Sequence, residues 1–379
     1  MRRILTLLLF AALALPATAQ RAHFNWEYDA DFRYIFDNRE FAYSNDAIIP
    51  SGTMHTIVLA PMAGFSVEQS PTVRHRLMVG VEFAHEMGSR TWTDFAREPL
   101  IFYNAHVRAR KGSFDAFAGV FSRNNVEGAY GEAFFSGMFR NSDRNIDGVL
   151  LKWRAERFYA EIGFDWMGQY GPQTRERFQV FSAGRWQAKE WLQLGWSGSF
   201  YHYACSQIAP NVVDNHLLQP WAKADFSRRT RWQELSVQAG LYVAYQLDRG
   251  RGTTPDIPLG GEIKLTARRW NVMLQNTTYA GGNLMPYFRE LDPAGIPYAT
   301  NLYFGTPCFD GFFNLSEVAW TPQIARYVQL RLAARFYVGK QGFLGWQQLA
   351  SLRFNLDALL HPATETAVGH GHRHPGSRL

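Results

Sequence analysis

The sequence predicts an all-β protein, a closed antiparallel transmembrane β-barrel of about 16 strands with short turns at one end and long loops at the other. Three observations support this fold class. Apolar and polar residues alternate with a period of two in many segments. Short and long connections follow each other in strict order. After the first residues, the chain lacks any apolar run long enough for a membrane-spanning helix.

The N-terminus has the pattern of a secretory signal peptide. Two arginines precede an apolar run from Leu5 to Pro16, and Ala-Thr-Ala follows at 17–19, which predicts cleavage before Gln20. A membrane helix is the alternative, but this run is shorter than the roughly 20 apolar residues that cross a bilayer. We therefore expect residues 1–19 to be a signal peptide and the mature chain to be exported.

The composition separates a barrel from a pair of soluble domains. Aromatic residues make up 15% of the chain and charged residues 19%, with 32 glycines and a mean hydropathy of −0.26. Many aromatic residues with a middling hydropathy are typical of strands that have one lipid-facing and one polar side. The net charge of +6 does not by itself indicate nucleic-acid binding.

The first mature segment shows the alternation most clearly. Its even-numbered residues from Phe24 to Phe36 are apolar, whereas its odd-numbered residues from His23 to Arg33 are polar or charged. Successive side chains of a strand point to opposite faces, so this segment predicts a long strand with one oily and one charged face. The expected strands are 24–36, 53–67, 73–86, 99–110, 113–122, 147–155, 158–167, 177–187, 191–204, 217–227, 232–247, 259–268, 270–279, 309–320, 326–338 and 346–356.

The connections between these strands alternate between short and long. Sixteen antiparallel strands need seven short turns and eight long loops when both ends of the barrel chain lie in the periplasm. A soluble β-sandwich is the alternative, but its strands are shorter and its connections need not alternate. Residues 132–140 could add one short strand. The short links are 68–72, 111–112, 156–157, 188–190, 228–231, 269 and 321–325, and the long ones 37–52, 87–98, 123–146, 168–176, 205–216, 248–258, 280–308 and 339–345.

The signal peptide, the amphipathic strands and the alternating connections resemble the outer-membrane porin class of Gram-negative bacteria. The resemblance covers residues 20–357 and rests on architecture, without a motif specific to one family. It implies a location in the bacterial outer membrane, contact with outer-membrane lipid and insertion by the barrel-assembly machinery. The class usually ends on a strand with a terminal aromatic residue, whereas here Phe354 and Leu356 are followed by a tail, 358–379.

Basic residues gather near the short turns, and parity places many of them on the polar face. A ring of cations in a water-filled channel lowers the barrier for anions, which would give a weak preference for anions. The alternative is that these side chains reach lipid headgroups or pair with acidic residues inside the barrel. The predicted pore-lining residues are Arg74, Arg76, Glu82, Arg108, Arg110, Lys152, Arg154, Glu161, Asp165, Arg185, Glu262, Lys264, Arg268, Arg331 and Arg335.

The third long loop, 123–146, carries charges of both signs. The resemblance to porins with sixteen strands implies that this loop folds inward and narrows the pore, and the alternative is an external flap. Cys205 and Cys308 are both expected at the external end, where export would permit a disulfide. The strands concerned are far apart in the barrel, so only an inward-folding loop could bring the two sulfur atoms together.

The C-terminal tail, 358–379, is rich in histidine, glycine and proline. A His-X-His-X-His run could bind a transition metal. Because no neighbouring carboxylate or cysteine fixes a coordination geometry, we expect a disordered tail and no metal site. The histidines are His361, His370, His372 and His374.

We expect a passive pore for small hydrophilic solutes, with no cofactor and no nucleic-acid partner, and leave self-association open. A barrel enzyme acting on envelope lipid or protein, or a surface barrel that binds a polysaccharide, are the alternatives. A hydrolase needs a nucleophile, a histidine and an orienting acid or amide. His202 shares parity with Phe200 and should face lipid or the rim, and His106 fits a channel wall beside Arg108. We therefore predict that the protein is not an enzyme.

Overall fold

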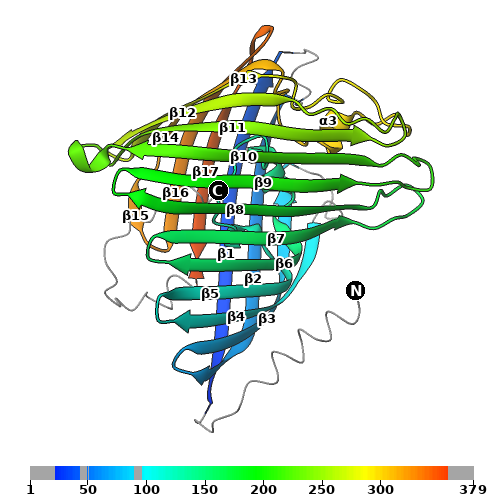
Figure 1. The fold of residues 1–379 in the computed structure, drawn as a ribbon. Coiled ribbons are helices and arrows are strands. Elements are labelled where there is room, and N and C mark those ends of the chain that lie inside the picture. The colour runs from blue at the N-terminus through cyan, green and yellow to red at the C-terminus, as the bar shows by residue number, and fades with distance from the viewer. Residues whose placement is uncertain (1–21, 43–48, 50, 89–95, 357–379) are drawn as a thin grey trace.

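The computed structural model describes residues 22–42, 49, 51–88 and 96–356. The predicted signal peptide, 1–19, and the histidine-rich tail, 358–379, lie outside the described residues. The described chain forms one continuous sheet in which sequence neighbours pair antiparallel, and β1 (His23–Phe41) pairs with β17 (Gly342–Asn355) to close the barrel (Figure 1). The described helices are too short or too polar to cross a membrane.

The expected strands are all present. Between β1 and β17 lie β2 (Gly52–Ser70), β3 (Val73–Glu86), β4 (Ala96–Ala109), β5 (Gly112–Ser122), β6 (Asn145–Ala155), β7 (Phe158–Gly168), β8 (Arg177–Lys189), β9 (Leu192–Tyr203), β10 (Val213–Asp225), β11 (Glu234–Asp248), β12 (Leu259–Arg269), β13 (Val272–Gly281), β14 (Gly311–Trp320), β15 (Gln323–Ala325) and β16 (Val328–Gly339). The three-residue β15 lies in a short turn, and β14 pairs directly with β16. The wall is therefore a closed barrel of sixteen long strands.

The additional short strand that residues 132–140 could have formed is not present. This part of the chain contains a helical turn, α2 (Gly137–Ser142), instead. Ser136 caps it, because its side-chain oxygen accepts a hydrogen bond from the backbone N–H of Phe139 at 3.0 Å. Further short helices are η2 (Arg123–Asn125), η3 (Ser227–Arg229) and α3 (Tyr298–Asn301).

Three prolines, Pro61, Pro99 and Pro220, lie within strands, and each is paired on one side only. In β10, Pro220 pairs with Trp196 of β9, but pairing with β11 passes from Leu218 to Trp221. Pro61 of β2 likewise pairs with β1, at a point where the pairing with β3 is interrupted. Since proline has no N–H to donate, each missing donor is accommodated where the neighbouring strand makes no pair.

The two faces of the wall differ as the alternation predicted. On β1, Trp26 is 66% exposed on the outer face, whereas the next residue, Glu27, is 2% exposed on the inner face. Trp153 and Trp270 are also exposed on the outside, at 54% and 75%, and Trp166 stacks against an outward-facing phenylalanine. An apolar outer face with aromatic side chains near the strand ends is what a bilayer requires of a barrel.

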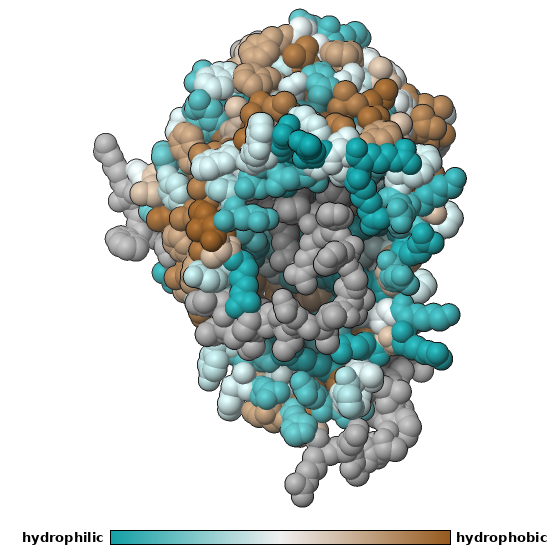
Figure 2. Space-filling view, turned by 90° about the vertical axis from the view of Figure 1, so that its left-hand side faces the viewer, coloured by the Kyte–Doolittle hydropathy of each residue, from teal (hydrophilic) through white to brown (hydrophobic). Residues whose placement is uncertain are grey.

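The two ends of the barrel also differ. Along the front wall in Figure 1, the short hairpin turns lie on the left and the longer loops on the right. Figure 2 looks at the end with the short turns, where hydrophilic residues surround a central region and hydrophobic residues lie on the flanks. The described parts of two long loops, 123–144 and 282–310, pack against the inner face of the barrel, as shown by their contacts below.

Candidate pore and its inward-folded loop

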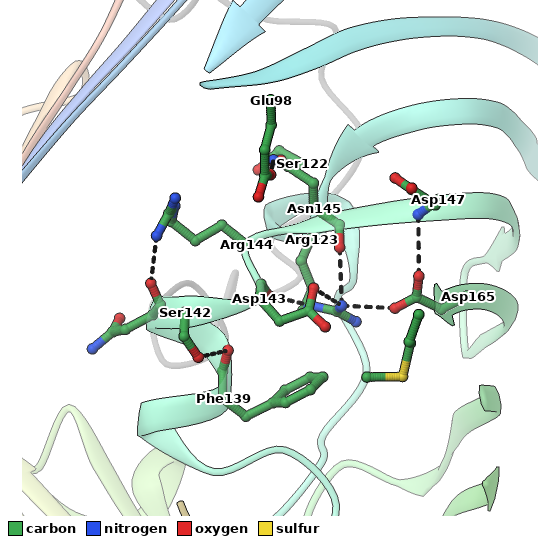
Figure 3. A network of polar contacts seen from close by, with 12 residues as sticks. Glu98, Ser122, Arg123, Phe139, Ser142, Asp143, Arg144, Asn145, Asp147 and Asp165 are labelled. Atoms are coloured by element: carbon green, nitrogen blue, oxygen red, sulfur yellow. Dashed lines mark hydrogen bonds and ion pairs between the residues drawn. The ribbon is translucent and has the colours of Figure 1, made fainter. Parts of the chain in front are cut away.

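Loop 123–144 is anchored at its base by Arg123. This guanidinium donates to the carboxylates of Asp165 at 2.7 Å and Asp143 at 2.8 Å, and to the backbone oxygen of Asn145 at 2.9 Å (Figure 3). The side chains of Arg123 and Asp165 are only 6% and 3% exposed. A buried ion pair of this kind holds the start of the loop against β7, because separating the pair would leave a charge buried without its partner.

The next residues of the loop cross to β7 and β9. The backbone N–H groups of Glu127 and Gly128 donate to the carboxylate of Glu161, at 2.9 and 2.8 Å. Ser197 of β9 donates its hydroxyl to the backbone oxygen of Ala129 at 2.7 Å. Glu161, one of the predicted pore-lining residues, accepts from these backbone amides and from the hydroxyl of Tyr159.

The carboxylate of Glu127 joins the loop to β6. It lies 3.2 Å from the ammonium of Lys152 and 2.5 Å from the guanidinium of Arg154. Arg154 also contacts Asp115 of β5, which lies 2.9 Å from Nδ1 of His106. Burial opposes ionisation of Glu127, but its two basic neighbours outweigh this effect and lower its pKa.

The middle of the loop reaches the opposite wall. Glu132 lies 3.2 Å from Arg335 of β16, which is 2.5 Å from Glu317 of β14. The second inward segment, 282–310, meets the loop at the same place. The hydroxyl of Ser136 donates to the backbone oxygen of Phe304 at 2.8 Å, and that of Thr306 donates to the backbone oxygen of Glu132 at 3.0 Å.

Aromatic side chains fill the space between the two inward segments and the wall. Tyr130 and Phe135 of the loop pack against Phe181 of β8, and Phe134 packs against Tyr242 of β11. Glu262 of β12 accepts hydrogen bonds from Tyr242 at 3.0 Å and from an amide of β10. Loop 123–144 therefore lies inside the barrel, packed against several strands, and the alternative of an external flap is wrong.

Many of the predicted pore-lining cations form ion pairs within the barrel. Arg74 and Arg76 approach Glu27 of β1, and Arg331 and Arg335 approach Glu317. The remaining predicted residues differ in their surroundings. The two acidic ones form ion pairs: Glu82 with Arg33 and Arg144, and Asp165 with Arg123. Arg268 contacts a methionine sulfur, and Arg185 lies over the ring of Tyr159. No ion pair is formed, among the described residues, by Arg108, Arg110 and Lys264.

The predicted set missed the inner face of β1. Glu27, Asp31, Arg33, Asp37 and Arg39 are all buried there. The alternation that places Trp26 outside also places these residues inside, so the signal was present in the sequence.

The candidate catalytic histidines lie apart. His106 faces the inside and contacts Asp115, whereas His202 contacts Asp214 at 3.1 Å near the outward-facing Phe178. In the described part of the chain, no disulfide joins Cys205 to Cys308. In the part of the chain that the structure describes, no three metal-ligating side chains come together.

No family model matches this chain, and no curated protein sequence matches it. Among solved structures, the chain is similar to the loop L8 deletion mutant of OmpT, an outer membrane protein of Vibrio cholerae. The TM-score is 0.51 at 11% identity, over 88% of this chain and 99% of that one. The fold is that of a porin-like outer-membrane β-barrel. Lower TM-scores of 0.44 and 0.42 relate it to a Rhodopseudomonas blastica porin triple mutant and to Pseudomonas aeruginosa OprD.

Those two likenesses are also distant. The porin mutant is 9% identical over 87% of this chain and 100% of that one, and OprD is 10% identical over 87% and 95%. At such identities the likeness concerns the fold alone. The outer-membrane location agrees with the apolar outer face of the barrel, and the function must be argued from its interior.

Proposed function

We propose that this outer-membrane barrel is a passive channel for small hydrophilic solutes, narrowed by loop 123–144. The observation that carries the proposal is the bridging of opposite walls by this loop. Glu127 pairs with β6 on one side, and Glu132 pairs with Arg335 of β16 on the other. A lumen lined by charged residues and crossed by such a loop admits solutes according to size and charge.

The ion pairs bear on the charge selectivity of the proposed channel. Lys152 and Arg154 are in contact with Glu127 and Asp115, and Arg331 and Arg335 with Glu317 and Glu132, so the positive charge of these four predicted pore-lining cations is balanced. Arg108 and Lys264 have no ion pair among the described residues. We therefore propose only a weak preference for anions, set by such uncompensated cations.

Single-channel recording in a planar bilayer tests the proposal. The purified mature protein should produce discrete conductance steps, and the reversal potential in asymmetric potassium chloride should indicate a slight preference for chloride. A matched preparation that has not been refolded serves as the control. A folded, inserted barrel that conducts no ions would overturn the proposal.

The enzymatic alternative has less support. His106 contacts Asp115, which also binds Arg154, so this group has the composition of a channel-wall ion cluster. The absence of enzymatic activity stays a prediction. A lipase and protease assay of the refolded protein, with His106→Ala as comparison, is its direct test.

A further inference from the structure

A cavity lined by four arginines lies between β1 and loop 123–144. Its volume is about 30 Å³. Apolar and amide side chains complete its wall. The lining residues are Arg33, Ile35, Arg123, Asn124, Val126, Phe135, Arg140, Asn141 and Arg144. Four like charges around one small space must be compensated by something that lies near them.

The carboxylates on the β1 side are shared. Glu82 lies 2.8 Å from Arg33 and 2.5 Å from Arg144, so one negative charge serves two guanidiniums. Asp31 lies 3.4 Å from Arg33 but is also bound by Arg353 at 2.6 Å. The side chains of Arg33 and Arg144 are 7% and 8% exposed, so water compensates little of their charge.

On the side of the cavity formed by loop 123–144, there are two carboxylates and one arginine without an ion pair. Arg123 binds both Asp143 and Asp165. Arg140 has no carboxylate within ion-pair distance among the described residues. Its guanidinium donates to two backbone oxygens and lies 5.8 Å from the ring of Phe135.

Arg140 is the lining arginine that no carboxylate contacts among the described residues. The other three are in ion-pair contact with Glu82, Asp31, Asp143 or Asp165. Glu132 acts on Arg140 only from a greater distance, and it is in contact with Arg335. A monovalent anion in the cavity would place a negative charge beside Arg140.

One of the lining arginines also has a donor to spare. Nη1 of Arg123 is buried and makes no hydrogen bond, whereas Nε of Arg33, also without a hydrogen bond, faces Asp31 at 3.4 Å. Buried donors are rarely left unsatisfied in folded proteins, and an ion or a water is a common partner. Guanidinium N–H groups form strong hydrogen bonds to anions, so a bound anion would satisfy the charge and the donor together.

The volume of the cavity accommodates a small anion. One water molecule needs roughly 10–15 Å³, so a cavity of about 30 Å³ has room for a halide ion.

We propose that this cavity binds one monovalent anion of chloride size, which contacts the lining arginines and fixes loop 123–144 against β1. Chloride would then be a structural component of the constriction as well as a permeating ion. The inference concerns the packing of the loop and does not depend on solute transport, so the site can exist even if the barrel conducts nothing.

Bromide provides the direct test. Crystals of the mature protein grown in sodium bromide should show an anomalous difference peak within hydrogen-bond distance of Arg33 and Arg123. A cavity with only water density under saturating bromide would overturn the proposal. This measurement uses the unaltered protein, so it does not depend on whether a variant folds.

Unfolding in solution provides the second test. The urea midpoint of the refolded barrel should be higher in sodium chloride than in sodium gluconate at equal ionic strength, and should saturate with chloride. Arg140→Gln should abolish this difference, whereas Arg185→Gln, which alters an inner-face arginine outside the cavity, should retain it. Equal midpoints in the two salts for the unaltered protein, or an equal loss in both variants, would refute a specific halide site.

Discussion

Replacing Glu127 by glutamine should loosen loop 123–144 without altering the barrel wall. The change keeps the size of the side chain and the backbone N–H that donates to Glu161. It removes the carboxylate from between Lys152 and Arg154. Lys152 would keep the backbone oxygen of Asn125, at 2.9 Å, and a neutral amide oxygen as acceptors, but would lose the negative charge beside it.

The size of the effect follows from burial. The Lys152 side chain is 4% exposed, so its charge would be left largely without water, whereas Glu127 is 25% exposed and partly hydrated. Removing one partner of a fully buried pair costs about 3–5 kcal/mol, and the partial exposure of Glu127 reduces this to about 2–3 kcal/mol. That free energy corresponds to a shift of roughly 30- to 150-fold in the equilibrium between docked and released loop.

Single-channel recording should reveal this shift as more frequent or larger conductance steps in Glu127→Gln than in the unaltered protein. Glu290→Gln is the matched control, because Glu290 pairs with a half-exposed arginine, Arg251, in another loop. Heat-modifiable mobility on a denaturing gel would show that each variant is folded. If the folded Glu127→Gln barrel conducts as the unaltered one does, the loop is not held by this carboxylate.

Three further outcomes are expected. The pKa of Glu127 is lowered from 4.5, so the contribution of this carboxylate to loop docking is present above pH 4.5 and is lost as the pH falls below that value. Conductance should therefore rise in acid, and should rise less in Glu127→Gln. Arg108→Glu should move the reversal potential toward cations, and an unchanged value would place Arg108 away from the ion path. Leu241 is 64% exposed at mid-strand on the outer face. Leu241→Arg should lower the free energy of unfolding by about 2–4 kcal/mol in urea titrations of liposome-inserted protein, and no loss would contradict a lipid-facing position.

The strands of the barrel wall could be predicted from the sequence because alternating apolar and polar residues within a strand indicate which face meets lipid. The alternation from Phe24 to Phe36 placed β1 correctly and implied the burial of Glu27 and Arg33. Loop lengths then gave the order of turns and the number of long strands. These are local properties, which a single sequence displays directly.

The interior was harder to predict because its contacts join residues distant in the chain. Glu132 and Arg335 are 203 residues apart, and no periodicity connects them. The resemblance to porins suggested an inward loop, but the contact of Ser136 with Phe304 was not foreseen. The alternation could place cations inside the barrel, yet only the folded arrangement shows which of them are compensated.

The seam between β1 and β17 sets the order in which the molecule can be completed. At this seam Arg353 donates to Asp31, 322 residues away. Most other strands pair with the strand that precedes or follows them in sequence. Because closing so long a loop carries the largest entropic cost, we expect this pairing to come late in folding. The hairpins that bear loop 123–144 and segment 282–310 can form earlier, but the two loops meet only when the sheet has curved. Completion of the seam and packing of the interior are therefore coupled, and a defect in either should delay the other.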